Sequence, residues 1–224
     1  MIQAVLFDLF ETLVTESCAS VRRASSLARQ LGVEDGAYKQ VWRSQRLDIV
    51  LGRCSLRDTL AAIVQTLGGT VDEAVLEGLR LERVQQKAAV LRGVEPEVLA
   101  ALEALRGRRV KLAVVTNSFA EDVAGWAQSA LRPFFDTTVV SCAVGIAKPD
   151  PKIYLLACRD LHVPPDRALF VGDGADDELQ GAERAGLRSC RALWFASRWP
   201  PGTVAREDAG LWHAAEVVQA AMAV

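Results

Sequence analysis

The chain has 224 residues, of which 50% are hydrophobic and 24% are charged, a balance typical of one globular unit or of a unit with a smaller insertion. The formal net charge of −2 gives no general attraction to nucleic acid or to an anionic membrane, and no apolar run approaches the roughly 18 residues that a membrane span needs. The five cysteines are odd in number, widely spaced and without a C-x-x-C pair, so we expect reduced thiols in a cytoplasmic protein.

The first predicted element lies in the stretch AVLFDLFETL, at residues 4–13. Its apolar residues 5–7 predict a buried strand, and the carboxylate of Asp8 follows directly. A carboxylate at the end of a buried strand loses hydration unless a partner uses its charge. Asp8 therefore either caps the next turn or serves a ligand at the carboxyl end of the strand.

A helical block follows the first strand, because residues 14–92 carry apolar side chains at helical spacing, interrupted by glycines. We expect its helices at residues 21–31, 38–51, 56–67 and 71–91. A block of this length is too long for a loop. It predicts a small helical subdomain that stands over the carboxyl edge of a sheet.

From residue 93 onward, predicted helices alternate with predicted strands. The helices are expected at residues 96–105, 120–131, 151–160, 176–185 and 210–224, and the strands at residues 110–115, 137–141, 168–171 and 188–193. This alternation indicates an α/β fold with a doubly wound parallel sheet. The sheet would be formed by residues 1–13 and 93–224, with residues 14–92 inserted after the first strand.

Polar side chains follow the predicted strands where each strand ends, or stand just before a helix. They are Asp8, Thr116, Asn117, Lys148, Asp173 and Asp177. Because parallel strands bring their carboxyl ends to one edge, we expect these groups around one crevice. Asp8 is a candidate carboxylate nucleophile, Thr116 offers a hydroxyl, and Lys148 is a point cation for a transferring group.

The acidic residues of this set predict a metal ion. Asp8, Asp173 and Asp177 would repel one another in one crevice unless a proton or a cation intervened. With oxygen ligands alone and no histidine near a strand end, the expected cation is Mg²⁺. Two neighbours, Asp176 and Glu178, are expected to face solvent or to favour the N-terminus of the following helix.

These motifs, in this order and spacing, resemble the haloacid dehalogenase superfamily of aspartyl-nucleophile hydrolases. The matching segments are Asp8-x-x-x-Thr12, Thr116-Asn117, Lys148-Pro149-Asp150-Pro151 and Gly172-Asp173-x-x-x-Asp177. The resemblance implies a Rossmann-like core with a helical cap of the first type at residues 14–92. It implies Asp8 as nucleophile and a Mg²⁺ site formed by Asp8, Asp173 and the backbone carbonyl of Phe10, with Asp177 in support. It also implies that Thr116 and Lys148 contact the phosphoryl or carboxylate group.

Phe10 departs from the pattern of the superfamily's phosphatases, which usually carry a second aspartate there as general acid. Members that resemble L-2-haloacid dehalogenases carry an aromatic residue at that position, and Trp42-Arg43 resembles their Trp-Arg pair, whose arginine assists halide release. The intact Asp173 and Asp177 favour a phosphatase instead, since the resemblance implies that those dehalogenases need no metal ion. Arg43 is therefore either a substrate-binding residue or an exposed helix arginine.

We therefore predict a Mg²⁺-dependent hydrolase with an aspartyl-phosphate intermediate, acting on a small phosphorylated metabolite. Thr116 would orient the phosphoryl oxygens and Lys148 would balance their charge, with Asn117 and Arg43 as substrate-binding candidates. Two alternatives stay open: an L-2-haloacid dehalogenase, and a phosphoryl-binding protein with little turnover. The expected partner is a small anionic molecule, and the sequence leaves the oligomeric state open.

Overall fold

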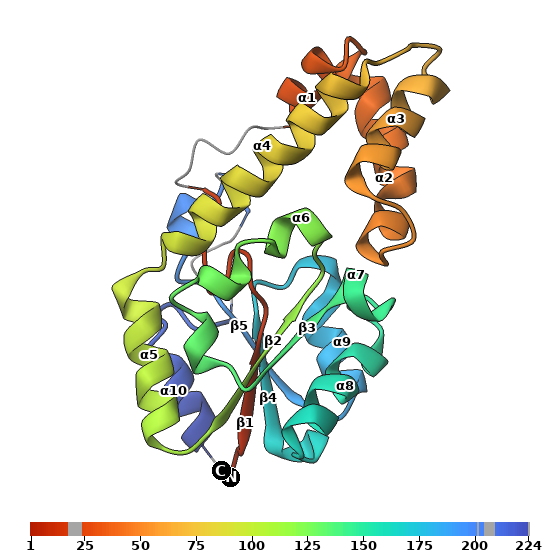
Figure 1. Cartoon of the computed structure of the whole chain (residues 1–224). Helices are drawn as coiled ribbons and strands as arrows, with labels where there is room; N and C mark the ends of the chain where they lie inside the picture. The colour runs from red at the N-terminus through yellow and green to blue at the C-terminus, as the bar shows by residue number, and fades with distance from the viewer. Residues whose placement is uncertain (18–23, 201, 204–208, 224) are drawn as a thin grey trace.

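A computed structural model describes residues 1–17, 24–200, 202–203 and 209–223 (Figure 1). Its strands form one parallel sheet in the order β3-β2-β1-β4-β5. Their bounds are β1 Ala4–Phe7, β2 Lys111–Thr116, β3 Thr137–Val140, β4 Ala168–Gly172 and β5 Arg188–Arg191. In the centre, Phe7 of β1 lies between Val114 of β2 and Val171 of β4. The predicted doubly wound α/β fold is confirmed.

Helices cover both faces of this sheet (Figure 1). On one face lie α5 (Pro96–Gly107) and α10 (Glu216–Met222), and on the other lie α8 (Pro151–Leu161) and α9 (Glu178–Arg184). Each face has its own apolar core, because the side chains of β1 alternate between the two cores. Both cores exclude water, which explains the continuous apolar runs of β1, β2 and β4.

The remaining long helices form a separate group that we call the helical insert, residues 24–92. Its elements are α1 (Ala24–Gln30), α2 (Asp35–Val50), α3 (Leu56–Thr66) and α4 (Glu73–Arg92). They share an apolar core of their own, and side chains of Glu34, Ser55 and Asp72 cap α2, α3 and α4. Figure 1 shows the insert beyond the carboxyl ends of the strands, joined to the sheet through the long α4. No described helix is both long enough and apolar enough to cross a membrane.

One predicted helix is wrong. Residues 120–131 form only the short α6 (Ala120–Val123) and a 3-10 turn at Trp126–Gln128. Just after this short helix, α4 approaches closely at Gly125, where a Cβ atom would lie 2.9 Å from the Cβ of Ala88. The close approach holds the insert against the segment that follows β2. A second short helix, α7 (Ser141–Val144), follows β3, and further 3-10 turns cover Arg132–Phe134, Pro165–Arg167, Ala175–Asp177 and Ala196–Arg198.

Two other predicted helices begin later than expected. Residues 210–215 are not helical, because Leu211 pairs with the end of β5 through hydrogen bonds to Arg191 and Leu193, and α10 begins only at Glu216. The helix expected from residue 176 begins at Glu178, since Asp176 and Asp177 adopt left-handed backbone conformations with φ of 53° and 52°. This second shift changes which acid faces the sheet edge.

Candidate active site

The carboxyl ends of the central strands surround one cavity of about 190 Å³. Asp8 follows β1, Thr116 ends β2, and Asp173 follows β4. Six residues singled out from the sequence line this cavity together: Asp8, Phe10, Thr116, Asn117, Lys148 and Asp173. Parallel pairing of the three strands accounts for their convergence, as the sequence predicts.

Lys148 lies at the centre of the charged groups. Its Nζ atom lies 2.5 Å from Oδ1 of Asp8 and 2.5 Å from Oε2 of Glu178, and its side chain is only 3% exposed. Both carboxylates raise the pKa of the buried ammonium against the opposing effect of burial, so Lys148 stays charged. A single cation is therefore shared between two buried carboxylates.

Glu178 is the residue that sequence reasoning placed wrongly. It was expected at the surface, yet it is 1% exposed, and its Oε1 atom accepts a hydrogen bond of 2.9 Å from the backbone N–H of Gly174. Room for this carboxylate depends on Gly172, where any Cβ atom would collide with Oε1. The left-handed turn at Asp176 and Asp177 moves the inward-facing position by one residue, and the sequence pattern alone does not indicate it.

Asp177, predicted to support a metal, lies on the exposed side of this turn and outside the acidic group. Asp176 is partly exposed and binds Arg46 and Asn117. Burial raises the pKa of Asp176, but these hydrogen bonds outweigh it and the net shift is downward. Asp176 is thus an ionised anchor, while Glu178 occupies the position near Lys148.

Asp8, Asp173 and Glu178 form a compact acidic group. One carboxylate oxygen from each lies within 4.8 Å of the others. Burial is the main cause that raises the pKa of all three, to about 7 for Asp8, and repulsion between neighbouring carboxylates adds to it. Three acids face the one ammonium of Lys148, so full ionisation of the group requires protons or a further cation to balance the excess negative charge. Oxygen ligands with this excess suit a hard cation such as Mg²⁺, so the residues present fit such an ion.

Thr116 and Asn117 line the same cavity as the acidic group. The hydroxyl of Thr116 is buried and shares a 2.7 Å hydrogen bond with the hydroxyl of Ser118. The side chain of Asn117 accepts from the backbone N–H of Lys148 at 2.8 Å and donates to its carbonyl at 2.9 Å. Asn117 therefore holds the segment that carries Lys148 in place.

The helical insert contributes an arginine to the cavity, but Arg46 lies there and Arg43 does not. Arg46 donates two hydrogen bonds of 3.1 and 3.0 Å to the carboxylate of Asp176 and lines the cavity beside Asp8. Arg43 is exposed and lines none of the described cavities. The two arginines are one helical turn apart on α2, so the spacing alone does not separate them.

Phe10 lies at the border with a second, larger cavity of about 330 Å³ under the insert. Phe10, Arg46 and Asn117 line both cavities, so the two are adjoining. The ammonium of Lys87, from α4, lies 3.8 Å from the centre of the Phe10 ring. A buried cation of the insert thus contacts Phe10, the position at which the resemblance implies a general acid in phosphatases.

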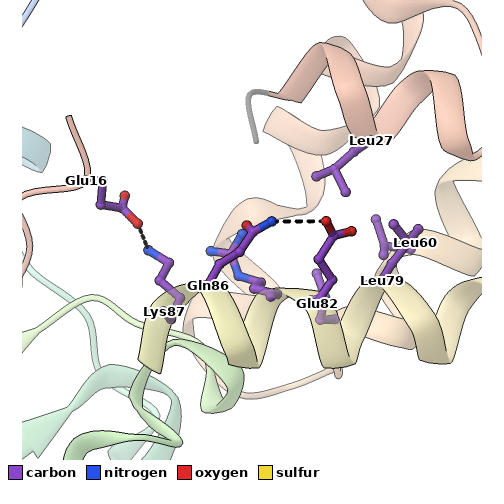
Figure 2. A pocket seen from close by; sticks show the side chains of 9 residues that line it. Glu16, Leu27, Leu60, Leu79, Glu82, Gln86 and Lys87 are labelled. Carbon is purple, nitrogen blue, oxygen red and sulfur yellow. Dashed lines mark hydrogen bonds and ion pairs between the residues drawn. The ribbon is translucent and has the colours of Figure 1, made fainter. Parts of the chain in front are cut away.

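Further into the insert, Lys87 also borders a third cavity (Figure 2). Figure 2 shows its ammonium directed toward Glu16, with which it forms an ion pair, while Leu27, Leu60 and Leu79 supply an apolar wall. The cation is thereby neutralised locally, and the ion pair joins α4 to the segment that follows β1.

Comparisons with known proteins agree with this arrangement. The family model of haloacid dehalogenase-like hydrolases matches residues 2–186. The glyceraldehyde 3-phosphate phosphatase of Methanopyrus kandleri is 29% identical over 85% of this chain and 84% of its own length. (S)-2-haloacid dehalogenase 2 of a Pseudomonas species is 30% identical over 84% of this chain and 82% of its own length. The crystal structure of a 2-haloacid dehalogenase from Pseudomonas syringae superposes with a TM-score of 0.67 at 25% identity, over the full length of both chains.

Proposed function

The chain belongs to the haloacid dehalogenase-like hydrolases, and from this membership we propose that it is a Mg²⁺-dependent phosphatase that uses Asp8 as nucleophile. The substrate is a small phosphorylated metabolite. One observation supports the choice of phosphatase: the buried Asp8 and Glu178 and the partly buried Asp173 lie together, and Lys148 is the cation that pairs with Asp8 and Glu178. The phosphatase among the relatives supports the same choice.

The charge balance separates the two chemistries. A haloacid carries one carboxylate and would enter a site that already holds an excess of buried negative charge, without bringing a cation. A phosphate ester that binds together with Mg²⁺ brings the missing positive charge into the site. Asp8 and Asp173, and Glu178 in place of the expected Asp177, are the side chains that would hold the ion, with the Phe10 carbonyl as a further ligand.

When bound, Mg²⁺ neutralises charge and polarises the phosphoryl group. The residues of the chain do the rest. Asp8, once ionised, attacks phosphorus with a carboxylate oxygen, the bond to the leaving oxygen breaks, and an aspartyl-phosphate forms. Lys148 balances the charge on the phosphoryl oxygens, and Thr116 orients them. Water then releases phosphate and restores Asp8.

A dehalogenase remains the second candidate because an aromatic residue, Phe10, stands where a general acid is expected, and because two of the relatives compared above are 2-haloacid dehalogenases. In that chemistry Asp8 would attack carbon and form an ester, and the departing halide would need no proton. Arg46, rather than Arg43, is the cation of α2 that lines the cavity for such an ion.

The covalent intermediate distinguishes these candidates. The protein is mixed with a phosphate monoester and Mg²⁺, quenched in acid within one turnover, and digested for mass spectrometry. We expect one phosphoryl group on the peptide that carries Asp8, and none in an Asp8→Asn variant. An organic ester on Asp8 after mixing with (S)-2-chloropropionate, with no phosphorylation by the phosphate esters, would reject the phosphatase and favour the dehalogenase.

A further inference from the structure

Two buried serines beside the sheet bind the carboxyl ends of helices in the insert. Ser141, at the start of α7, donates a hydrogen bond of 2.8 Å to the carbonyl of Val50, the last residue of α2. Ser129, between β2 and β3, donates one of 2.8 Å to the carbonyl of Leu91, near the end of α4. The last carbonyls of a helix lack partners within that helix, so each serine satisfies one of them. Both serines therefore hold the insert against the sheet.

Ser141 differs from Ser129 in the backbone group that its hydroxyl accepts. Ser141 accepts the N–H of Ser118 at 3.1 Å, whereas Ser129 accepts the N–H of Leu131 at 3.2 Å. Ser118 lies just beyond β2, and its hydroxyl shares a 2.7 Å hydrogen bond with the hydroxyl of Thr116, which lines the candidate active site. A continuous series of hydrogen bonds thus runs from the end of α2 through Ser141 and Ser118 to Thr116.

Tight packing surrounds this series of hydrogen bonds. The side chains of Thr116, Ser118 and Ser141 are all buried. Next to Ser141, the insert approaches so closely that a Cβ atom at Gly52 would collide with the carbonyl oxygen of Cys142. Figure 1 shows this end of α2 beside α7. A shift of α2 would therefore be felt at the end of β2 through direct contacts.

The number of protons gives each hydroxyl of the series one role. A serine or threonine hydroxyl donates a single proton. If Thr116 donates its proton to a phosphoryl oxygen, the 2.7 Å hydrogen bond must be donated by Ser118. The proton of Ser141 is directed to Val50, which leaves its oxygen free to accept the backbone N–H of Ser118. Ser118 is thus held by its backbone and orients Thr116 with its side chain.

We propose that Ser118 and Ser141 are positioning residues of the phosphatase. Ser118 directs the hydroxyl of Thr116 toward the phosphoryl oxygens, and Ser141 fixes Ser118 while α2 lies against the sheet. This role rests on the proposed function, in which Thr116 orients the phosphoryl group. The insert then does more than cover the site, because its position controls a group that binds the phosphoryl oxygens.

A double-mutant cycle tests the role of Ser118 on 4-nitrophenyl phosphate in the presence of Mg²⁺. Ser118→Ala should lower kcat/KM about three- to tenfold, as the loss of one hydrogen bond predicts. In a Thr116→Val background, which lacks the hydroxyl to be oriented, the same change should cost less than about twofold. A serine that only supports the fold would cost the same factor in both backgrounds.

Ser129→Ala is the matched control for Ser141→Ala. Each variant loses a buried hydroxyl that joins the insert to the sheet side, so the two Tm values should fall by similar amounts. At a temperature at which both variants are folded, Ser141→Ala should lower kcat/KM about three- to tenfold and Ser129→Ala less than about twofold. The loss in Ser141→Ala should also disappear in the Thr116→Val background. If Ser141→Ala does not fold, the cycle at Ser118 decides alone.

Equal losses of kcat/KM in Ser141→Ala and Ser129→Ala, or an equal effect of Ser118→Ala in both backgrounds, would overturn the positioning role while leaving a phosphatase. If the unmodified protein releases no phosphate from the ester, the role falls together with the proposed function.

Discussion

The Oε2 atom of Glu178 lies 2.5 Å from the Nζ atom of Lys148, deep under the carboxyl edge of the sheet. Through this ion pair, α9 fixes the lysine that also binds Asp8. Two carboxylates then compete for one ammonium, which makes the negative charge on Asp8 costly and the site receptive to a further cation.

Glu178→Gln tests this competition. Because the charge of Glu178 raises the pKa of Asp8, its removal should lower that pKa, and the acidic limb of the kcat/KM profile should move to lower pH. Mg²⁺ affinity, measured by calorimetry, should weaken at the same time. Asp177→Asn is the matched control, since that acid is exposed and outside the acidic group. A larger loss of Mg²⁺ affinity in Asp177→Asn than in Glu178→Gln would instead support Asp177 as the metal-binding residue, as the sequence predicted.

The titration of Asp8 should appear in stability as well. Burial raises its pKa from 3.8 to about 7, although Lys148 opposes the rise. The folded state therefore holds more protons than the unfolded state between about pH 4 and about pH 7, and the free energy of unfolding falls as pH rises through this window. Urea unfolding in chelator should show a contribution of this sign, which Asp8→Asn lacks. Equal pH slopes for the two proteins would contradict the assigned shift.

Arg46 and Arg43 should differ in function although they lie one turn apart on α2. Arg46→Ala removes the bidentate contact with Asp176 and a cation from the cavity wall, so KM should rise several-fold. Stability should change by less than about 1 kcal/mol, because the ion pair is partly exposed. Arg43→Ala should leave kcat, KM and any halide release within about twofold. Loss of activity in Arg43→Ala alone would support the dehalogenase resemblance instead.

Phe10 should make the rate depend steeply on the leaving group. General acid catalysis contributes about 10²–10⁴-fold, so a site without the usual acid should hydrolyse aryl phosphates far faster than alkyl phosphates. Phe10→Asp should speed hydrolysis of the alkyl esters selectively. The ammonium of Lys87 lies 3.8 Å from the centre of the Phe10 ring, so it would keep the new aspartate ionised. A second substitution, Lys87→Met, should therefore increase the gain. Similar chemical-step rates for both ester types in the unmodified protein would show that another residue supplies the proton.

The sequence predicts the sheet and its chemistry because both depend on patterns that are local. Apolar runs ending in polar groups identify β1, β2 and β4, and parallel order then places Asp8, Thr116 and Asp173 at one edge. The prediction of the acidic residues fails where the backbone conformation of one or two residues determines which side chain faces the cavity. The left-handed turn at residues 176–177 directs Glu178 inward, and the sequence before it contains no pattern that predicts the turn.

The contributions of the insert were harder to predict for a different reason. Helical periodicity identifies α2 and α4, but it does not fix how they are rotated over the sheet. The close approach at Gly125 and the ion pair between Lys87 and Glu16 hold α4, and the ion pair between Arg46 and Asp176 holds α2. All of these contacts join segments far apart in the chain, so the sequence pattern alone could not place Arg46 at the cavity.

The most direct test of the central claim is to measure phosphate and halide release side by side, from 4-nitrophenyl phosphate and (S)-2-chloropropionate, in chelator and after Mg²⁺ is added back. The close grouping of Asp8, Asp173 and Glu178 around one ammonium predicts phosphate release that is lost in chelator and restored by Mg²⁺, with no halide release in either condition, and no activity in Asp8→Asn. Halide release that persists in chelator, without Mg²⁺-dependent phosphate release, would contradict the account.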